Sequence, residues 1–148
     1  MKKLAITLTA ALLFFSYSTF AMDPENISLK VKAAFEKDFN NAKNVNWKKT
    51  DEFYFASFKL NDVDIDAAYN ENGELIAASK SIAISALPMQ VSLALTEKYK
   101  NYALPENVIE FTHGGETNYY ITVSNEKRIL KLKCNTSGNI SVEKKIKK

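Results

Sequence analysis

Residues 44–78 contain four short apolar runs separated by turn residues, and this stretch limits the possible folds more than any other part of the chain. The first run alternates apolar and polar residues, while the second, 53–60, is apolar on both faces. The segments 61–62, Asn-Asp, and 70–73, Asn-Glu-Asn-Gly, are typical of tight hairpin turns. The stretch therefore predicts four antiparallel strands in a meander.

One amphipathic helix is predicted before this meander and a second one after it. Apolar residues recur at helical spacing over 27–39 and again over 91–99. We expect the first helix to start near Pro24 or Asn26, with Asp23 as its N-cap, because Asp before Pro favours a helix start. Proline at position 88 is expected to begin the second helix.

A fainter copy of the helix and strands follows, up to residue 146. The sequence therefore predicts two tandem units, each a helix followed by an antiparallel meander, with residues 22–87 in the first unit and 88–148 in the second. Both helices are expected to pack on one face of the sheet. The expected fold class is α+β, in a single domain.

The first 21 residues have the three parts of a secretory signal peptide. Lys2 and Lys3 precede an apolar run over 4–15, and Thr19-Phe20-Ala21 fits the signal peptidase rule. The run is shorter than the roughly 20 residues that span a bilayer. We therefore predict cleavage after Ala21 and a mature protein in the periplasm.

Charge narrows the range of partners. Without the two lysines of the signal peptide, 18 basic residues stand against 17 acidic ones, a net charge of +1 that argues against nucleic acid as a partner. Residues 22–87 carry a net charge of −3 and residues 88–148 a net charge of +4. The lysines of the C-terminal tail, at roughly 1 kcal/mol each, give only marginal attachment to anionic lipid. No stable membrane insertion is expected.

Aromatic residues gather in the first meander, where one helix can cover only one face. The parity of the next strand places Tyr54 and Phe58 against the helix and leaves Phe53 and Phe55 on the open face. Exposed apolar patches often mark contact sites, with aromatic side chains as anchors. Trp47, Phe53 and Phe55 are therefore predicted to bind a partner. The alternative is that the other half of the chain, or a second protomer in a weak homo-oligomer, covers them.

Asp64 and Asp66 point to one side of the predicted third strand and are added to the predicted binding residues. Their spacing superficially suggests a calcium loop, but the required Gly and bidentate Glu are missing, so a solvated acidic face is the interpretation. Lys131 and Lys133 form a basic face on the matching later strand. An acidic and a basic face that meet across an interface favour specificity and association rate.

His113 and Cys134 are each the only residue of their type. A lone histidine can form neither a zinc site nor a catalytic triad. A lone cysteine makes no intrachain disulfide, and we interpret Cys134 as a small buried filler. No nucleophile, base and orienting group occur together, so we predict no enzyme activity, no cofactor and no metal.

Three segments carry a family resemblance: V-K-A-A-F-E-K-D-F-x-N-A-K-N-V-x-W, I-D-A-A-Y-N-E-N-G-E-L-I-A and A-L-P-M-Q-V. The pattern, over about 27–146, resembles the PepSY-like family of secreted bacterial proteins, which are described as beta-lactamase-inhibitor-like. The resemblance implies paired helix-and-sheet units, export to the periplasm and no known catalysis.

The predicted function is a non-catalytic periplasmic binding module that contacts an envelope protein or peptide through its open aromatic face. The alternative is a peptidase-regulating or envelope-stress protein that acts by adding its last strand, 140–146, to the edge of a target.

Overall fold

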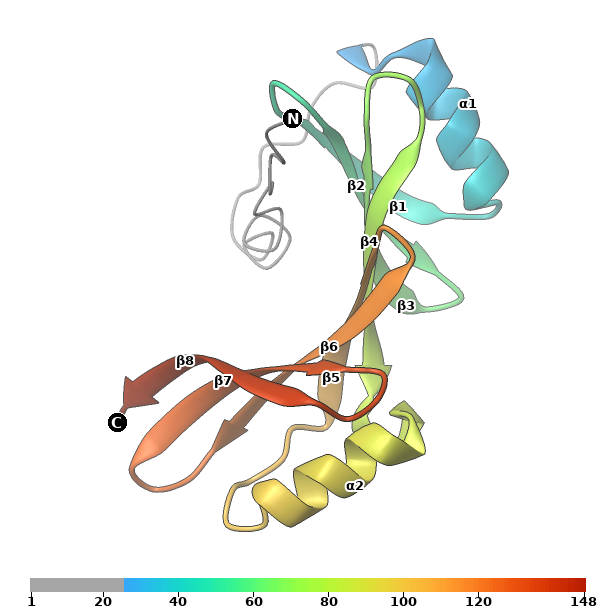
Figure 1. Cartoon of the computed structure of the whole chain (residues 1–148). Coiled ribbons are helices and arrows are strands. Elements are labelled where there is room, and N and C mark those ends of the chain that lie inside the picture. Colours follow the sequence, from blue (N-terminus) through green and yellow to red (C-terminus); the bar gives the residue numbers. More distant parts are fainter. Residues whose placement is uncertain (1–25) are drawn as a thin grey trace, which may run out of the picture.

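The computed structural model describes residues 26–148; the predicted signal peptide and the expected N-cap Asp23 lie outside the described residues. The described chain forms one antiparallel sheet of eight strands with two α-helices and a short 3-10 helix, Ile84–Ala86 (Figure 1). The α-helices are α1 (Leu29–Asp38) and α2 (Met89–Lys98). The strands are β1 (Lys43–Lys49), β2 (Tyr54–Leu60), β3 (Val63–Tyr69), β4 (Leu75–Ala83), β5 (Asn107–His113), β6 (Glu116–Ser124), β7 (Arg128–Asn135) and β8 (Ile140–Lys147).

The sheet is a continuous meander, in which every strand pairs with the next strand along the chain. β4 pairs with β5 from Ala77 opposite His113 to Ala83 opposite Asn107, so the sheet does not break at the expected boundary of two units. The predicted α+β fold of two tandem helix-plus-meander repeats is therefore wrong, and the chain is mainly β. The physical reason is that a sheet edge at β4 would leave backbone N–H and C=O groups unpaired, and β5 pairs with them.

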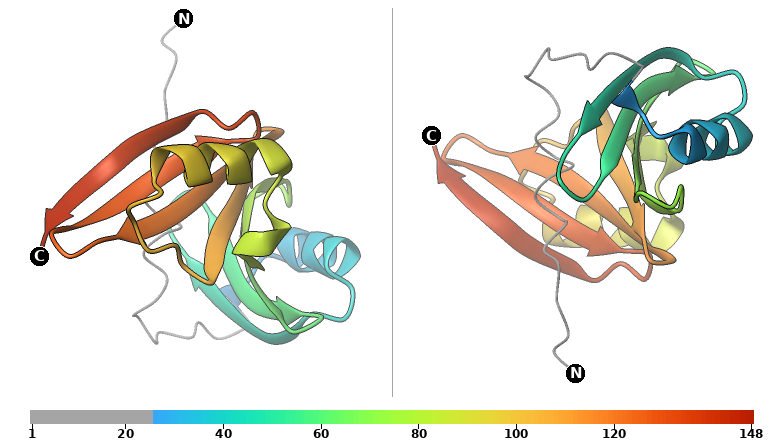
Figure 2. Two further views of the ribbon diagram at one scale, coloured as in Figure 1. Left: turned by 90° about the horizontal axis from the view of Figure 1, so that it is seen from below. Right: turned by 90° about the horizontal axis from the view of Figure 1, so that it is seen from above.

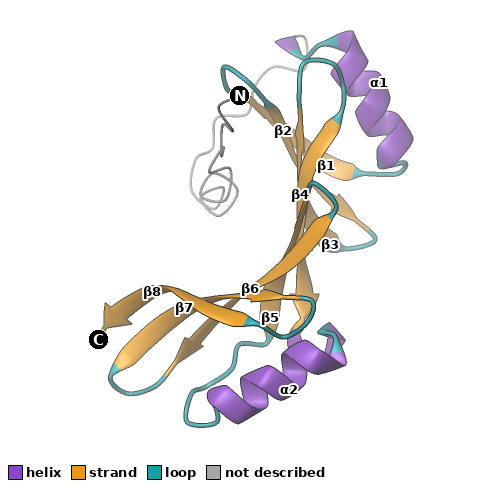
Figure 3. Ribbon diagram, in the orientation of Figure 1, coloured by secondary structure: helices purple, strands orange, loops and turns teal. Residues whose placement is uncertain are grey.

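The sheet is bent into a C, and both helices lie on its outer face (Figure 1). α1 covers β1 to β3 at one end, and α2 covers β5 to β8 at the other (Figure 2). Each helix has only ten residues, and the strands make up most of the fold (Figure 3). Neither helix of the described region is long and apolar enough to cross a membrane.

The core under α1 is aromatic. Val31 and Phe35 of α1 are buried against the sheet, and the Phe35 ring lies 5.1 Å from the Trp47 ring and 5.0 Å from the Phe58 ring, centroid to centroid. α1 begins at Leu29, after an N-cap at Ser28, and so starts later than the sequence predicts. Ile27, between a 3-10 residue at Asn26 and the start of α1, is already buried in this core.

The core under α2 is mostly aliphatic. Val91 and Leu95 of α2 pack on Ile121 and Leu132 of the sheet, and all four are almost fully buried. Cys134 belongs to this core and has no exposed surface, so its interpretation as a buried filler is confirmed. Burial raises the pKa of the Cys134 thiol, which keeps the thiol in its neutral form.

Two glycine turns hold the helices in place. The turn at 70–73 brings Gly73, with φ +79°, so close to α1 that a Cβ atom there would lie 2.9 Å from the Lys30 carbonyl oxygen. The turn at 135–138 does the same at α2, where a Cβ on Gly138, with φ +85°, would lie 2.7 Å from the Gln90 carbonyl oxygen. Both positions therefore need glycine for its backbone and for its size.

Alanine substitutions should separate these two requirements. Gly115 has a similar φ of +80° but open space around it, so Gly115→Ala is expected to cost only the backbone strain, about 1–2 kcal/mol. Gly73→Ala and Gly138→Ala add a clash with helix backbone and should lower the free energy of unfolding further. Urea unfolding of the three variants measures the difference. Equal losses of unfolding free energy in all three variants would show that the close contact with the helices does not contribute to stability.

Candidate binding face

The inner face of the C, opposite both helices, carries a second apolar cluster of its own. We call this surface the helix-free face, since neither helix of residues 26–148 lies on it. The cluster spans β2 to β6, and its members are Phe53, Phe55, Ala68, Ile76, Ala77, Phe111 and Tyr120. Aromatic rings meet edge to face at both ends of the cluster, Phe53 with Phe55 at 6.2 Å and Phe111 with Tyr120 at 6.1 Å between centroids.

Strand register positions these side chains. Phe55 lies opposite Ala68, and Ala68 lies opposite Ala77 on the next strand. The two alanines leave space above β3 and β4, so the aromatic rings of β2 and of β5 and β6 can approach across them. Small side chains on the inner side of a bend also allow the sheet to curve.

A polar row runs beside the aromatic cluster. The Ser57 hydroxyl donates a hydrogen bond to Asp66, and Ser79 lies opposite Asp66 on β4. Burial raises the pKa of the Asp66 carboxyl, an effect that the Ser57 bond opposes and that the nearby negative charge of Asp64 reinforces. Asp66 is therefore a half-buried acid on the β3 side of the face rather than part of a fully solvated acidic surface.

Charge of opposite sign flanks the row at the two ends of the sheet. Asp64 has a side chain that is 74% exposed and pairs with Lys59 at 2.7 Å on the β2–β3 side. Lys133 lies opposite Tyr120 on the β7 side of the same face, and Lys131 follows it by strand alternation. The helix-free face thus has an acidic part, an aromatic middle and a basic part.

Two of the predicted binding residues need correction. Trp47 lies opposite Ala56 in the β1–β2 pairing, so its side chain points to α1, and only 8% of it is exposed. Trp47 therefore does not share a face with Phe55. Phe55 is on the helix-free face and belongs to its cluster, but it is only 4% exposed, so the expectation of an open ring is wrong. Phe53 is half-buried, and Asp64 and Asp66 lie on the helix-free face with it.

Sequence reasoning missed the half of the face that comes from β5 and β6. Phe111 and Tyr120 lie in regions that alternate only weakly, and their role depends on the β4–β5 pairing. The Tyr120 hydroxyl is buried and has no hydrogen-bond partner within residues 26–148. The signal that could have found them is the second aromatic pair, Tyr119-Tyr120, in which one ring must point away from α2.

His113 stacks on Phe111, with ring centroids 6.4 Å apart, at the end of β5. Across residues 26–148, no group of three or more His, Cys, Asp or Glu side chains is arranged to hold a metal ion. The chemistry of the face is therefore aromatic contact, hydrogen bonding to Asp66 and charge at its two ends.

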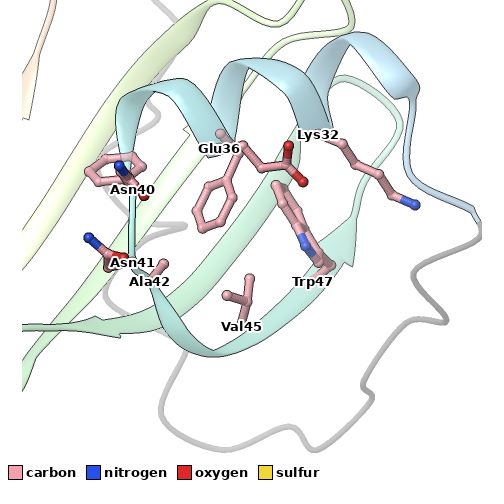
Figure 4. Close-up of a pocket in the computed structure, with 9 residues that line it drawn as sticks. Lys32, Glu36, Asn40, Asn41, Ala42, Val45 and Trp47 are labelled. Atoms are coloured by element: carbon pink, nitrogen blue, oxygen red, sulfur yellow. The ribbon is translucent and has the colours of Figure 1, made fainter.

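A separate groove of about 600 Å³ lies on the outer side of the sheet, between α1 and β1 (Figure 4). Val45 and Trp47 point from β1 toward the helix, and Lys32 and Glu36 extend from α1 beside them. No residue of β2 or β3 lines the groove, so it opens along the outer edge of β1.

Solved structures with the same architecture come from Bacteroides. A BLIP-like protein from Bacteroides fragilis superposes with a TM-score of 0.70 at 21% identity, over 88% of this chain and 92% of its own. The chain has the BLIP-like fold. A DUF2874 family protein from Bacteroides uniformis gives a TM-score of 0.68 at 17% identity, over 82% and 89% of the two chains. An inferred periplasmic protein from Bacteroides eggerthii superposes with a TM-score of 0.68 at 16% identity, over 81% of this chain and 88% of its own.

No family model matches the chain, and no curated protein matches it either. The likeness to the BLIP-like and DUF2874 structures is therefore one of fold. It agrees with the beta-lactamase-inhibitor-like part of the resemblance seen in the sequence.

The buried acid predicts a pH effect on stability. Because the folded-state pKa of Asp66 is raised above its usual 3.8, the fold favours the neutral acid, and stability is lost as the pH rises through that raised pKa. Asp66→Asn stays neutral, so its free energy of unfolding relative to the wild type should be higher at pH 7 than at pH 3.5. Urea unfolding at both pH values measures this difference, and a difference that stays constant or reverses would contradict it.

Proposed function

We propose that this protein is a non-catalytic periplasmic binding module and that its helix-free face contacts an envelope protein or peptide. The observation that carries the proposal is the one-sided coverage of the sheet: both helices lie on the outer face, while an aromatic cluster occupies the inner face. The BLIP-like fold and the inferred periplasmic relative support it. Membership of the PepSY-like family is part of this proposal.

The chemistry of the face favours a protein over a small molecule. Phe53 and Tyr120 are half-buried, so a partner can cover the parts of their rings that remain open. Asp64 and Lys131 are exposed at opposite ends of the face, much farther apart than one small ligand would reach, because β3 and β7 are separated by three strands. A partner surface with charges at matching positions would be oriented by both ends.

Strand addition through β8 is the second candidate. Within residues 26–148, β8 pairs with β7 alone, so its outer edge has backbone groups available. Almost every β8 side chain is exposed, however, so the strand offers backbone pairing with little side-chain selectivity. A register shift between Lys131 and Leu132 also distorts the ladder there. The helix-free face is better supported as the contact surface.

Site-specific photocrosslinking in the periplasm tests the proposal. A benzophenone side chain at position 64 or 131, on the helix-free face, should capture the same partner from both ends of the face. The matched control is position 97, exposed on α2 on the outer side of the sheet. Crosslinks from position 97 alone, or from none of the three, would contradict the proposal.

Two variants in the same crosslinking experiment show whether the partner binds the helix-free face or the β8 edge. Phe53→Ser removes a half-buried ring and should lower the yield of the crosslink while thermal unfolding still shows a folded protein. Proline in place of Val142, which is exposed on β8, should leave the yield unchanged. The opposite pattern would assign binding to strand addition.

A further inference from the structure

The outer edge of β1 and the groove beneath α1 lie side by side. Within residues 26–148, β1 pairs only with β2, so alternate backbone N–H and C=O groups of β1 point away from the sheet. The ladder is regular over 46–49, after a register shift near Asn44. An edge strand next to a groove under a helix is the geometry in which an extended peptide gains backbone hydrogen bonds and a place for its side chains.

The lining of the groove is mixed. Its apolar part consists of the partly exposed Phe39 and Val45 beside the buried rings of Phe35 and Trp47, and its polar part comes from Lys32, Glu36, Asn40 and Asn41. Its volume of about 600 Å³ is in the range of known ligand sites. A strand added to β1 would point every second side chain toward α1 and so into the groove.

At the other helix, α2, the equivalent position beside the covered strand is already occupied by a strand of the same chain. β5 lies under α2 as β1 lies under α1, and the position beside β5 is occupied by β4, which pairs with it antiparallel. Ile82 lies opposite Val108, and both Ile82 and Ile84 pack on the core that α2 covers. Ile82 on β4, together with Ile84 in the short 3-10 helix that follows β4, thus fills this position at α2. At α1 no strand of the described residues takes the corresponding place.

Charge indicates the kind of strand that would fit at β1. β1 contains three lysines and no acidic residue. The Lys49 ammonium lies over the Tyr54 ring, 5.0 Å from its centroid, and Lys43 is exposed at the start of the strand. At the groove itself, Lys32 and Glu36 of α1 offset one another. The edge is therefore basic as a whole, and an acidic occupant complements it.

We propose that the outer edge of β1 and the α1–β1 groove bind an extended acidic peptide, antiparallel to β1, with an apolar residue at every second position. This site is on the other side of the sheet from the helix-free face and does not depend on the function proposed for that face. Its occupant is a peptide segment of another protein.

Trp47 provides a direct measurement, because it is the only tryptophan of the chain and lines the groove. The probe is a capped hexapeptide in which glutamate and isoleucine alternate. Titration into the mature protein should give a saturable change in tryptophan emission. The same peptide with lysine in place of glutamate should bind at least about tenfold more weakly, because the charge complementarity is lost. A glutamate peptide with alternate backbone nitrogens methylated should lose binding, because it cannot donate hydrogen bonds to β1.

Paired variants locate the site. Lys43→Glu reverses a charge on the side of β1 to which the glutamates would point, because Lys43 lies opposite Lys59, and it should weaken binding of the glutamate peptide at least about fivefold through repulsion. The matched control is Lys144→Glu on β8, the other edge strand, where the same change of charge should have less than about a twofold effect.

Chemical-shift mapping with the unsubstituted protein makes the test independent of whether the variants fold. Shifts confined to β1 and α1 support the proposal. Shifts confined to β8 or to the helix-free face overturn it, as does the absence of any saturable binding by the glutamate peptide. Equal binding of the methylated peptide overturns the strand-addition part.

Discussion

Pairing between β4 and β5 is the interaction on which the rest of the structure depends. It joins the strands under α1 to the strands under α2 in one hydrogen-bonded sheet, and it carries Ile82 into the α2 core. On the outer face between the helices, Lys80 and Glu110 lie opposite each other on these two strands and form an ion pair at 3.0 Å. A partly exposed ion pair of this kind adds little stability, but it covers the stretch of sheet that neither helix reaches.

The bend of this sheet gives its two faces different compositions. The outer face buries large side chains beneath the helices, with Phe35 at the centre of one core and Leu95 in the other. The inner face has Ala68 and Ala77 at the centre of its cluster, with aromatic rings on either side. Phe55 is buried there although neither α-helix lies above it. The face is therefore a packed surface with partly open rings at its margins.

Local chemistry made part of this fold predictable. Asn61 and Asp62 both have positive φ in a two-residue hairpin turn, as their residue types suggest, and Gly73 takes the left-handed conformation expected of it. The helix-facing side of β2 also follows from strand alternation. These features depend on residues close together in the sequence, so the sequence alone contains enough information to predict them.

Features set by distant contacts could not be predicted in the same way. The side of the sheet on which Trp47 lies depends on its pairing with Ala56, and that register is set across the turn after β1 and by the irregularity near Asn44. Phe55 and Phe111 belong to one cluster only because β4 pairs with β5. α1 begins at Leu29, later than the start near Pro24 or Asn26 that the sequence predicts, and Ile27 is already buried before it. Only the part of the candidate face that lies on β2 and β3 could thus be predicted from the sequence.

The groove and the helix-free face meet at β1. Val45 and Trp47 point to the groove, while Asn46 lies opposite Ser57 and so belongs to the other face. A peptide added beside β1 would become a ninth strand, and its side chains would alternate between the two sides in the same way. Half of them would enter the groove, and the other half would extend the helix-free face beyond its present edge.

Occupation of the groove would therefore enlarge the surface available to a partner on the inner face, next to the acidic part of that face around Asp64 and Asp66. An acidic peptide would add further negative charge to the same end, which strengthens the contrast with the basic end around Lys131 and Lys133.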